Sequence, residues 1–379
     1  MKDINRYRGC LIGGAAGDAL GYAVEFLQAD QIFQKYGQRG ITEYRLTNGV
    51  AQISDDTQMT LFTAAGLLLG TTRGMTRGIM GSYEDYIARC YSDWLKTQTR
   101  VSPNNSDDRY SWLINVPELH HCRAPGITCL SALRSGQPGT IENPINQSKG
   151  CGGVMRVAPI GLYLHGRLSS DEIDMLGARA AAITHGHELG YLPAAILVHI
   201  INLVAHDEKV ALLSAVIDSL ATVERLFPNA RHMDELDRLI EKAIDFAQKD
   251  MNDVDAIHQL GGGWVAEETL AIAIYCSLKY QNDFDQAIIA SVNHSGDSDS
   301  TGSVTGNILG VYLGLDAIPA KYIDHLEIKD IILEIADDLY HDCPINEGKD
   351  TADQKWLQKY VSCDYVPSKE RAVELGKHS

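Results

Sequence analysis

Two rows of glycine near opposite ends of the sequence most strongly constrain how this chain can fold. They lie in "RGCLIGGAAGDALGYAVEF" and "STGSVTGNILGVYLGL", with one glycine every four residues: Gly9, Gly13, Gly17 and Gly21, then Gly302, Gly306, Gly310 and Gly314. Residues four apart share one helix face, although glycine costs about 1 kcal/mol relative to alanine inside a helix. A bare face lets another backbone pack closely. We therefore expect two buried central helices, packed against each other; small-residue packing without any chemistry would explain the glycines equally well.

The rest of the chain also has helical periodicity. Apolar residues recur at helical spacing in "MTLFTAAGLLLG", "LPAAILVHIINLVAH" and "EETLAIAIYCSLKY", and alternating strand patterns are scarce. Two stretches rich in Pro, Gly, Asn and Ser, residues 96–127 and 135–153, predict longer loops. Together these patterns predict an all-α fold.

Charge and cysteine usage narrow the class of protein. The formal net charge is −17, which makes nucleic acid and anionic membranes poor electrostatic partners. The N-terminus lacks an apolar signal core, and no uninterrupted apolar run is long enough for a membrane span. Eight dispersed cysteines without a CxxC pair predict reduced thiols and disfavour a cysteine-rich zinc site. We expect a cytoplasmic protein.

Two short acidic motifs, "SDDT" and "GDSDST", offer oxygen ligands. The first precedes an apolar helical run, so capping and the helix dipole would explain it without a metal. The second is not an EF-hand, because the twelfth position falls on Ile308 rather than on a glutamate. Taken together, the motifs supply carboxylates and hydroxyls that suit Mg²⁺ or Mn²⁺. The candidate ligands are Ser54, Asp55, Asp56, Asp297, Asp299 and Ser300.

Two further elements are candidates for the same interior. Asp18 and Glu25 are seven residues apart on the first glycine-rich helix, which predicts that both carboxylates face the same way. In "SKGCGGVMRV", the residues Gly150, Gly152 and Gly153 could direct backbone N–H groups at an anion. An ordinary connection between a loop and a helix would explain these glycines as well.

Six strings in this order resemble the ADP-ribosylglycohydrolase family: "GCLIGGAAGDALGYAVEF", "SDDTQM", "GCGGVMRVAPIGL", "THGHELGYLPAA", "GGGWVAEETLAIA" and "HSGDSDSTGSVTGNILG". The family includes the dinitrogenase reductase-activating glycohydrolase and the ADP-ribosylarginine hydrolases. The resemblance runs from about Tyr7 to Leu315. It implies a compact multi-helix domain with a central cleft that holds two Mg²⁺ or Mn²⁺ ions and receives ADP-ribose. We expect residues 1–320 to form the catalytic domain and 321–379 a helical extension packed on it.

The resemblance also implies roles for individual residues. Ser54, Asp55, Asp56, Asp297, Asp299 and Ser300 would bind the metals, and Glu25 would act as an acid or base beside them. The pyrophosphate would meet the main chain of Gly150, Gly152, Gly153, Val154 and Met155. His185 would approach the ligand, while Trp264 and Glu267 would line the rim. Arg156 would either clamp a phosphate or pair with acids in the core. Cys151 departs from the family, which usually has a polar residue such as Asn there.

The implied reaction is hydrolysis of the bond between C1″ of ADP-ribose and a protein side chain, releasing ADP-ribose. The string "GGWVAEE" looks more like the arginine-directed branch than the serine-directed one, so an ADP-ribosyl-arginine protein is the expected substrate. ADP-ribosyl-serine, a small ADP-ribosyl adduct or a modified nucleobase stay open as alternatives. A non-catalytic ADP-ribose-binding relative is a further alternative, but it would predict a broken acidic set, and here the set is intact.

Overall fold

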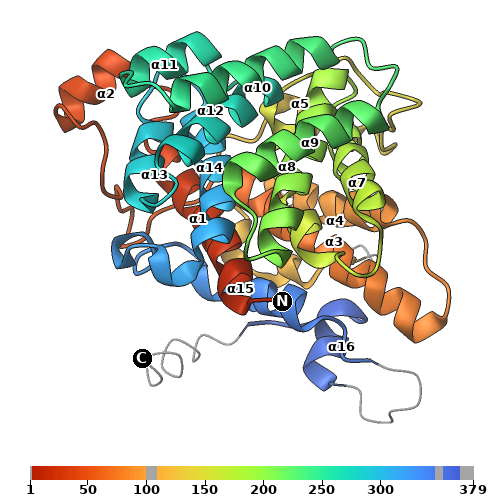
Figure 1. Ribbon diagram of the computed structural model, residues 1–379. Coiled ribbons are helices and arrows are strands. Elements are labelled where there is room, and N and C mark those ends of the chain that lie inside the picture. The colour runs from red at the N-terminus through yellow and green to blue at the C-terminus, as the bar shows by residue number, and fades with distance from the viewer. Residues whose placement is uncertain (1, 100–108, 346–352, 368–379) are drawn as a thin grey trace.

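The computed structural model describes residues 2–99, 109–345 and 353–367, and in these ranges the protein is built from helices, with isolated β-bridges and no sheet (Figure 1). The all-α prediction is confirmed. The α-helices are α1 Ile4–Tyr22, α2 Ala29–Tyr36, α3 Asp55–Arg77, α4 Tyr83–Gln98, α5 Ile127–Arg134, α6 Ala158–Tyr163, α7 Ser170–Ala182, α8 Glu188–His206, α9 Leu212–Leu226, α10 Met233–Ala247, α11 Asp253–Leu260, α12 Ala266–Lys279, α13 Phe284–Val292, α14 Ser298–Leu313, α15 Lys329–His341 and α16 Gln354–Tyr360. Short 3₁₀ helices are η1 Trp112–Asn115, η2 Pro117–Leu119, η3 Cys151–Gly153, η4 Leu315–Ala317 and η5 Ala320–Tyr322.

The two glycine-rich helices, α1 and α14, pack against each other in the middle of the molecule (Figure 1). A Cβ atom added to Gly13 would lie 2.3 Å from the carbonyl oxygen of Gly306, and one added to Gly17 would lie 1.9 Å from that of Gly302. No side chain fits at such distances, so the backbones themselves are in contact. The sequence prediction of a close central pair is confirmed.

Helix α8 lies in the core beside α6, α7 and α9. By length and composition it is apolar enough to cross a membrane, but 89% of its apolar window is buried inside the protein. The side chains of α8 that would face lipid in a membrane therefore pack against other helices. Across the described ranges, α8 is the single helix with this composition.

The C-terminal helices contact the rest of the molecule. On α15, the Asp337 carboxylate accepts a hydrogen bond from Arg8 Nε of α1 at 2.6 Å. On α16, Trp356 Nε1 donates to the hydroxyl of Thr72 in α3 at 3.0 Å. The predicted boundary at residue 320 stays a prediction, and residues 346–352 and 368–379 of the predicted extension lie outside the described ranges.

Candidate functional site

The two acidic motifs begin two different helices. Ser54 is the N-cap of α3, where its hydroxyl oxygen accepts the N–H of Asp56 at 3.2 Å. Asp297 is the N-cap of α14, where its carboxylate accepts the N–H of Ser300 at 3.3 Å. Both motifs therefore cap the N-terminus of a helix. These two N-termini also place the positive ends of two helix dipoles at one buried region.

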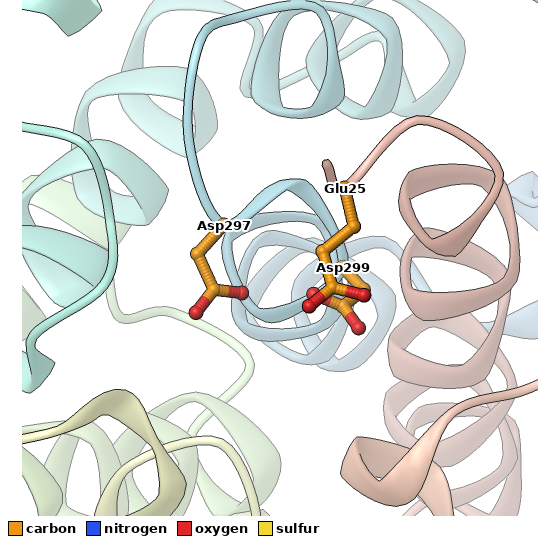
Figure 2. Close-up of side chains that lie close together, drawn as sticks. All are labelled: Glu25, Asp297 and Asp299. Atoms are coloured by element: carbon orange, nitrogen blue, oxygen red, sulfur yellow. The ribbon is translucent and has the colours of Figure 1, made fainter. Parts of the chain in front are cut away.

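Three carboxylates meet in that region. Glu25, Asp297 and Asp299 are buried, and each offers a carboxylate oxygen within 4.8 Å of the others, close enough to share one metal ion (Figure 2). Glu25 comes from the segment after α1, and the two aspartates come from the start of α14. Elements from opposite ends of the chain therefore build one acidic group.

Glu25 is not on the first helix, contrary to the sequence prediction. Helix α1 ends at Tyr22, and the chain then turns, with the N–H of Val24 bonded to Gly21 O at 2.9 Å and that of Leu27 bonded to Val24 O at 2.8 Å. Helix α14 still lies against this end of α1, since a Cβ atom on Gly21 would lie 2.2 Å from Ser298 O. The turn after α1, rather than helical spacing, brings Glu25 to the aspartates.

Asp18 is buried near Glu25, whose pKa its charge helps to raise. Its carboxylate accepts hydrogen bonds from the N–H of Ser54 at 2.9 Å, from the N–H of Thr57 at 3.1 Å and from the Thr57 hydroxyl. Asp18 therefore fastens the N-terminus of α3 to α1. It positions the first acidic motif.

The first acidic motif lies beside the second. Ser300 Oγ of α14 donates to Asp56 Oδ1 of α3 at 3.3 Å, which joins the two motifs directly. On the other side, the N–H of Gly126 donates to Asp55 Oδ2 at 3.3 Å. The structure thus brings together all six predicted metal-binding residues, at the N-termini of α3 and α14, with Glu25, which follows the C-terminus of α1.

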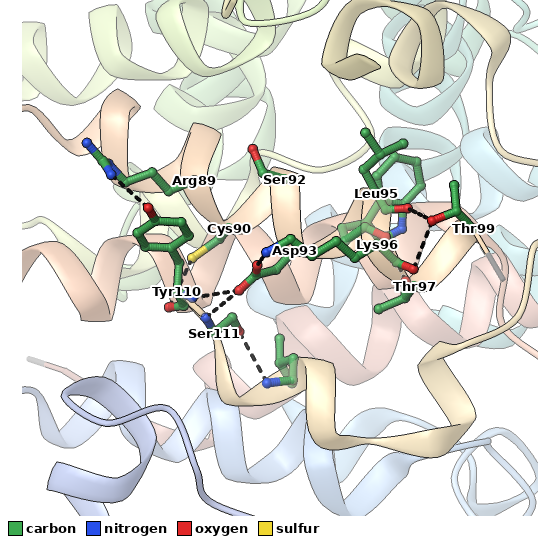
Figure 3. A network of polar contacts seen from close by, with 12 residues as sticks. Arg89, Cys90, Ser92, Asp93, Leu95, Lys96, Thr97, Thr99, Tyr110 and Ser111 are labelled. Atoms are coloured by element: carbon green, nitrogen blue, oxygen red, sulfur yellow. Dashed lines mark hydrogen bonds and ion pairs between the residues drawn. The ribbon is translucent and has the colours of Figure 1, made fainter. Parts of the chain in front are cut away.

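Gly126 belongs to the long segment between α4 and α5, which α4 anchors (Figure 3). Asp93 Oδ2 accepts the N–H groups of Tyr110 at 2.6 Å and Ser111 at 2.9 Å, and Arg89 donates to the Tyr110 hydroxyl at 3.1 Å. Of the predicted 96–127 loop, residues 96–98 belong instead to α4 and Ile127 begins α5, and the described rest consists of η1, η2 and irregular chain; residues 100–108 lie outside the described ranges.

Burial makes the charged forms of these carboxyls costly. It raises the pKa of Glu25 to about 10, with further contributions from Asp299 and Asp55. It raises the pKa of Asp297 to about 6 and raises those of Asp55, Asp56 and Asp299 well above their usual range, again with help from neighbouring carboxylates. Glu25 Oε2 and Asp56 Oδ2 are buried and have no hydrogen-bond partner in the described structure. Such a group fits a divalent cation, which would supply both the missing charge and the missing partners.

The glycine turn lies against this acidic group. Cys151 in η3 donates its thiol to Asp297 Oδ2 at 3.0 Å. The N–H groups of Val154 and Met155 are bonded to Cys151 O at 2.9 and 3.2 Å, and both residues are buried. Their main-chain contact with a pyrophosphate stays a prediction, as does that of Gly150, Gly152 and Gly153.

His185 lies beneath the glycine turn. A Cβ atom on Gly152 would be 2.9 Å from its Cε1 atom, and its Nδ1 atom is 2.8 Å from the Thr184 hydroxyl. Burial, helped by the charge of Arg156, lowers the pKa of His185 to about 3, so the ring is neutral. Its predicted contact with the ligand is untested, and its contacts with the turn are structural.

Arg156 is fully buried and has neutral partners. It donates to Ala180 O at 3.1 Å and to the Thr184 hydroxyl at 2.7 Å, and it lies over the Tyr91 ring at 4.5 Å. These contacts include no ion pair with a core acid, which was one predicted alternative; the other, a phosphate clamp, stays a prediction. In the described structure Arg156 connects α7 and α4 beside the glycine turn.

The two predicted rim residues differ in exposure. Trp264 is 47% exposed, whereas Glu267 is buried and forms an ion pair with Lys149. The loop that carries Trp264 is tied to the acidic group, because Asp297 N–H donates to Gly262 O at 2.8 Å. Phe26, which follows Glu25, is 71% exposed and stacks on Trp264. Sequence reasoning missed Phe26, and its only signal was its place beside Glu25.

Comparison with known proteins agrees with this arrangement. A family model of ADP-ribosylglycohydrolases matches residues 1–348. The chain belongs to the ADP-ribosylglycohydrolase family. As a member of this family it is an enzyme that hydrolyses an ADP-ribosyl linkage, with ADP-ribosylated compounds as its class of substrate and ADP-ribose as its product.

Individual relatives are distant but match along most of their length. The ADP-ribosyl-[dinitrogen reductase] glycohydrolase of Rhodospirillum rubrum is 25% identical, over 86% of this chain and 91% of its own. The ADP-ribosylhydrolase ARH3 of Danio rerio is 24% identical, over 89% of this chain and 90% of its own. The ADP-ribosylarginine hydrolase Tri1 of Pseudomonas putida is 23% identical, over 90% of this chain and 79% of its own. A solved structure of an ADP-ribosylglycohydrolase-related protein complex shares the fold of this ADP-ribosylglycohydrolase, with a TM-score of 0.60 and 23% identity. The match covers 89% of this chain and 98% of the other.

Proposed function

We propose that this protein is a cytoplasmic, metal-dependent hydrolase that removes ADP-ribose from modified arginine in proteins. The observation that carries the proposal is the buried acidic group, where two carboxylate oxygens, Glu25 Oε2 and Asp56 Oδ2, have no partner in the described structure. A protein gains nothing in stability from burying like charges without a counterion. Such a group is explained by the cations it would hold.

Two Mg²⁺ or Mn²⁺ ions are the proposed cofactors, held by Ser54, Asp55, Asp56, Asp297, Asp299 and Ser300. All of these donors are oxygen atoms, which hard divalent cations prefer. Bound there, the cations would orient ribose hydroxyls and acidify a water molecule. Two soft donors lie nearby and already have partners: the Cys151 thiol donates to Asp297, and the Met155 sulfur accepts from Ser300 Oγ at 3.9 Å.

Glu25 is the proposed proton carrier. Hydrolysis adds the oxygen of water to C1″ while the bond from C1″ to the guanidine nitrogen breaks, and the nitrogen gains the proton that the water loses. A carboxyl group at this position can accept the proton from water and deliver it to the leaving nitrogen. Asp18, through its bonds to Ser54 and Thr57, keeps the first acidic motif in place during the step.

The arginine linkage rests on the "GGWVAEE" string and on two relatives of the chain. One relative is named an ADP-ribosylarginine hydrolase and another a dinitrogen reductase glycohydrolase. The name of the ARH3 relative specifies no linkage, which keeps open the second candidate, a hydrolase of another ADP-ribosyl linkage such as serine.

Separately prepared arginine-, serine- and nucleotide-linked ADP-ribose substrates distinguish these candidates. With Mg²⁺ or Mn²⁺ present, we expect free ADP-ribose from the arginine conjugate at a rate at least tenfold above the others, a factor equivalent to about 1.4 kcal/mol. A preference for serine would replace the proposed linkage. Release from none of them would favour a protein that only binds ADP-ribose.

A further inference from the structure

An exposed pair of aromatic rings lies next to the acidic group. Phe26 and Trp264 are 71% and 47% exposed, their ring centroids are 6.3 Å apart and their planes differ by 25°. The other large apolar side chains that the described structure leaves exposed are aliphatic. The two exposed aromatic rings of the described chain thus stack on each other at one place.

Rigid backbone supports this pair. The N–H groups of Gly262 and Gly263 donate to Glu268 Oε2 at 2.9 and 3.1 Å, and Gly263 has a φ of 76° that favours glycine. The indole lies over Gly262, since a Cβ atom there would be 3.0 Å from Cδ1 of Trp264. The loop therefore fixes the indole while leaving part of it open to solvent.

Acidic residues lie beside the pair. Phe26 directly follows Glu25 in the chain, and the Trp264 loop holds Asp297 through Gly262 O. Lys149, a basic group near the loop, is paired with Glu267, and Lys242 donates to Gln259 O just before the loop at 2.7 Å. Flat aromatic faces favour a planar cation, and the guanidinium group stacks well on such faces.

We propose that Phe26 and Trp264 hold the guanidinium group of the arginine that carries ADP-ribose. This inference rests on the proposed arginine-directed function. The guanidinium is bonded to C1″, so it must lie at the reacting end of the substrate, beside Glu25. The adenine, which is also flat, lies at the opposite end of ADP-ribose, beyond two riboses and the pyrophosphate. The pair thus selects the linkage, and the interior binds the ADP-ribosyl part.

The test compares two conjugates and the product on the full, metal-loaded protein. Phe26→Ala and Trp264→Ala should each raise KM for an ADP-ribosyl-arginine peptide about 5- to 30-fold, with a smaller change in kcat. KM for an ADP-ribosyl-serine peptide and the calorimetric Kd of ADP-ribose should stay within about twofold, because neither ligand has a guanidinium. Phe26→Tyr and Trp264→Phe keep an aromatic face and should restore most of the affinity.

Ile79→Ala is the matched control, since Ile79 is 81% exposed and follows the far end of α3, about 30 Å from the acidic motif at its start. An unchanged KM for the arginine conjugate in both alanine variants would overturn the inference. An equal loss of affinity for ADP-ribose would also overturn it, because the rings would then bind the nucleotide. If the wild-type protein released nothing from the arginine conjugate, the proposed function itself would fail before any variant is compared.

Discussion

At the level of the single residue, Glu25 combines two properties. One of its carboxylate oxygens lies within 4.8 Å of ligand atoms of Asp297 and Asp299, and Oε2 has no hydrogen-bond partner in the described structure. Both properties suit a metal ligand, and a carboxyl group at this place could also carry a proton. The sequence assigned the residue to the site but left its role open.

Glu25→Gln separates these properties, because glutamine keeps the shape and an oxygen donor but cannot exchange the proton. We expect kcat to fall about 10²- to 10⁴-fold, the usual contribution of a general acid or base. Metal affinity, measured by calorimetry, should weaken less than in Asp299→Asn. Near-normal turnover in Glu25→Gln would show that another group moves the proton.

Asp299→Asn removes a charge from the centre of the acidic group. We expect metal affinity and turnover to fall about a hundredfold or more. In the metal-free protein this variant should unfold at the same or a higher temperature than wild type, since a buried like charge is lost. The surface variant Asp234→Asn is the control, and equal effects of the two substitutions would argue against a specific site.

The contact between α1 and α14 belongs to the scale of elements. Gly306→Ala would place a methyl group 1.9 Å from Gly13 O, so the two helices would have to separate. We predict a loss of about 1–3 kcal/mol or more in the free energy of unfolding, from urea denaturation. Turnover should fall as well, because both helices lead into the acidic group.

Gly74→Ala in α3 is the matched control for this prediction. Its nearest neighbour would be Met80 Cβ at 3.4 Å, and the site is helical and without a positive φ. There the substitution should stabilise the protein by up to about 1 kcal/mol through helix propensity alone. Destabilisation of the same size at both glycines would refute the account of the close helix pair.

The sequence predicted the elements better than the contacts between them. Glycine spacing sufficed for the close pair of α1 and α14, because only a bare face tolerates such an approach. It could not show that α1 ends at Tyr22, because the spacing of Asp18 and Glu25 suits a longer helix equally well. Nor could it show that Asp18 fastens α3, because its acceptor role depends on backbone N–H groups 36 and 39 residues away.

At the scale of the whole molecule, the buried carboxyls link stability to pH and metal. Burial raises the pKa values of Asp18 and Asp297 from 3.8 to about 6 in the folded protein. A raised carboxyl pKa stabilises the folded state below the unfolded value, and this contribution is lost as the pH rises through about 6. Above that pH the metal-free protein holds repelling charges that a cation would neutralise.

We therefore predict that Mg²⁺ or Mn²⁺ raises Tm more at pH 7.5 than at pH 5, where protons compete for the carboxylates. Thermal unfolding with metal and with a chelator, at both pH values, checks this. The difference should shrink strongly in Asp299→Asn at pH 7.5. A metal-induced shift in Tm that is the same at both pH values would contradict the account.

The candidate site was predictable as a set of residues but not as a geometry. Ordered motifs identified the acidic residues of α3 and α14, and the structure brings them together through the bond from Ser300 to Asp56. The contacts of Gly126 with Asp55 and of Cys151 with Asp297 had no signal in the sequence, because each depends on where a loop meets a helix start.

The most direct test of the central claim is a crystal structure with Mn²⁺, measured at a wavelength where manganese scatters anomalously. We predict two anomalous peaks inside the acidic group, each in contact with carboxylates among Glu25, Asp55, Asp56, Asp297 and Asp299. The same crystals soaked with a chelator should lose both peaks. Manganese peaks elsewhere would contradict the claim. An acidic group without manganese would also contradict it, provided that the crystallised protein still hydrolyses its substrate.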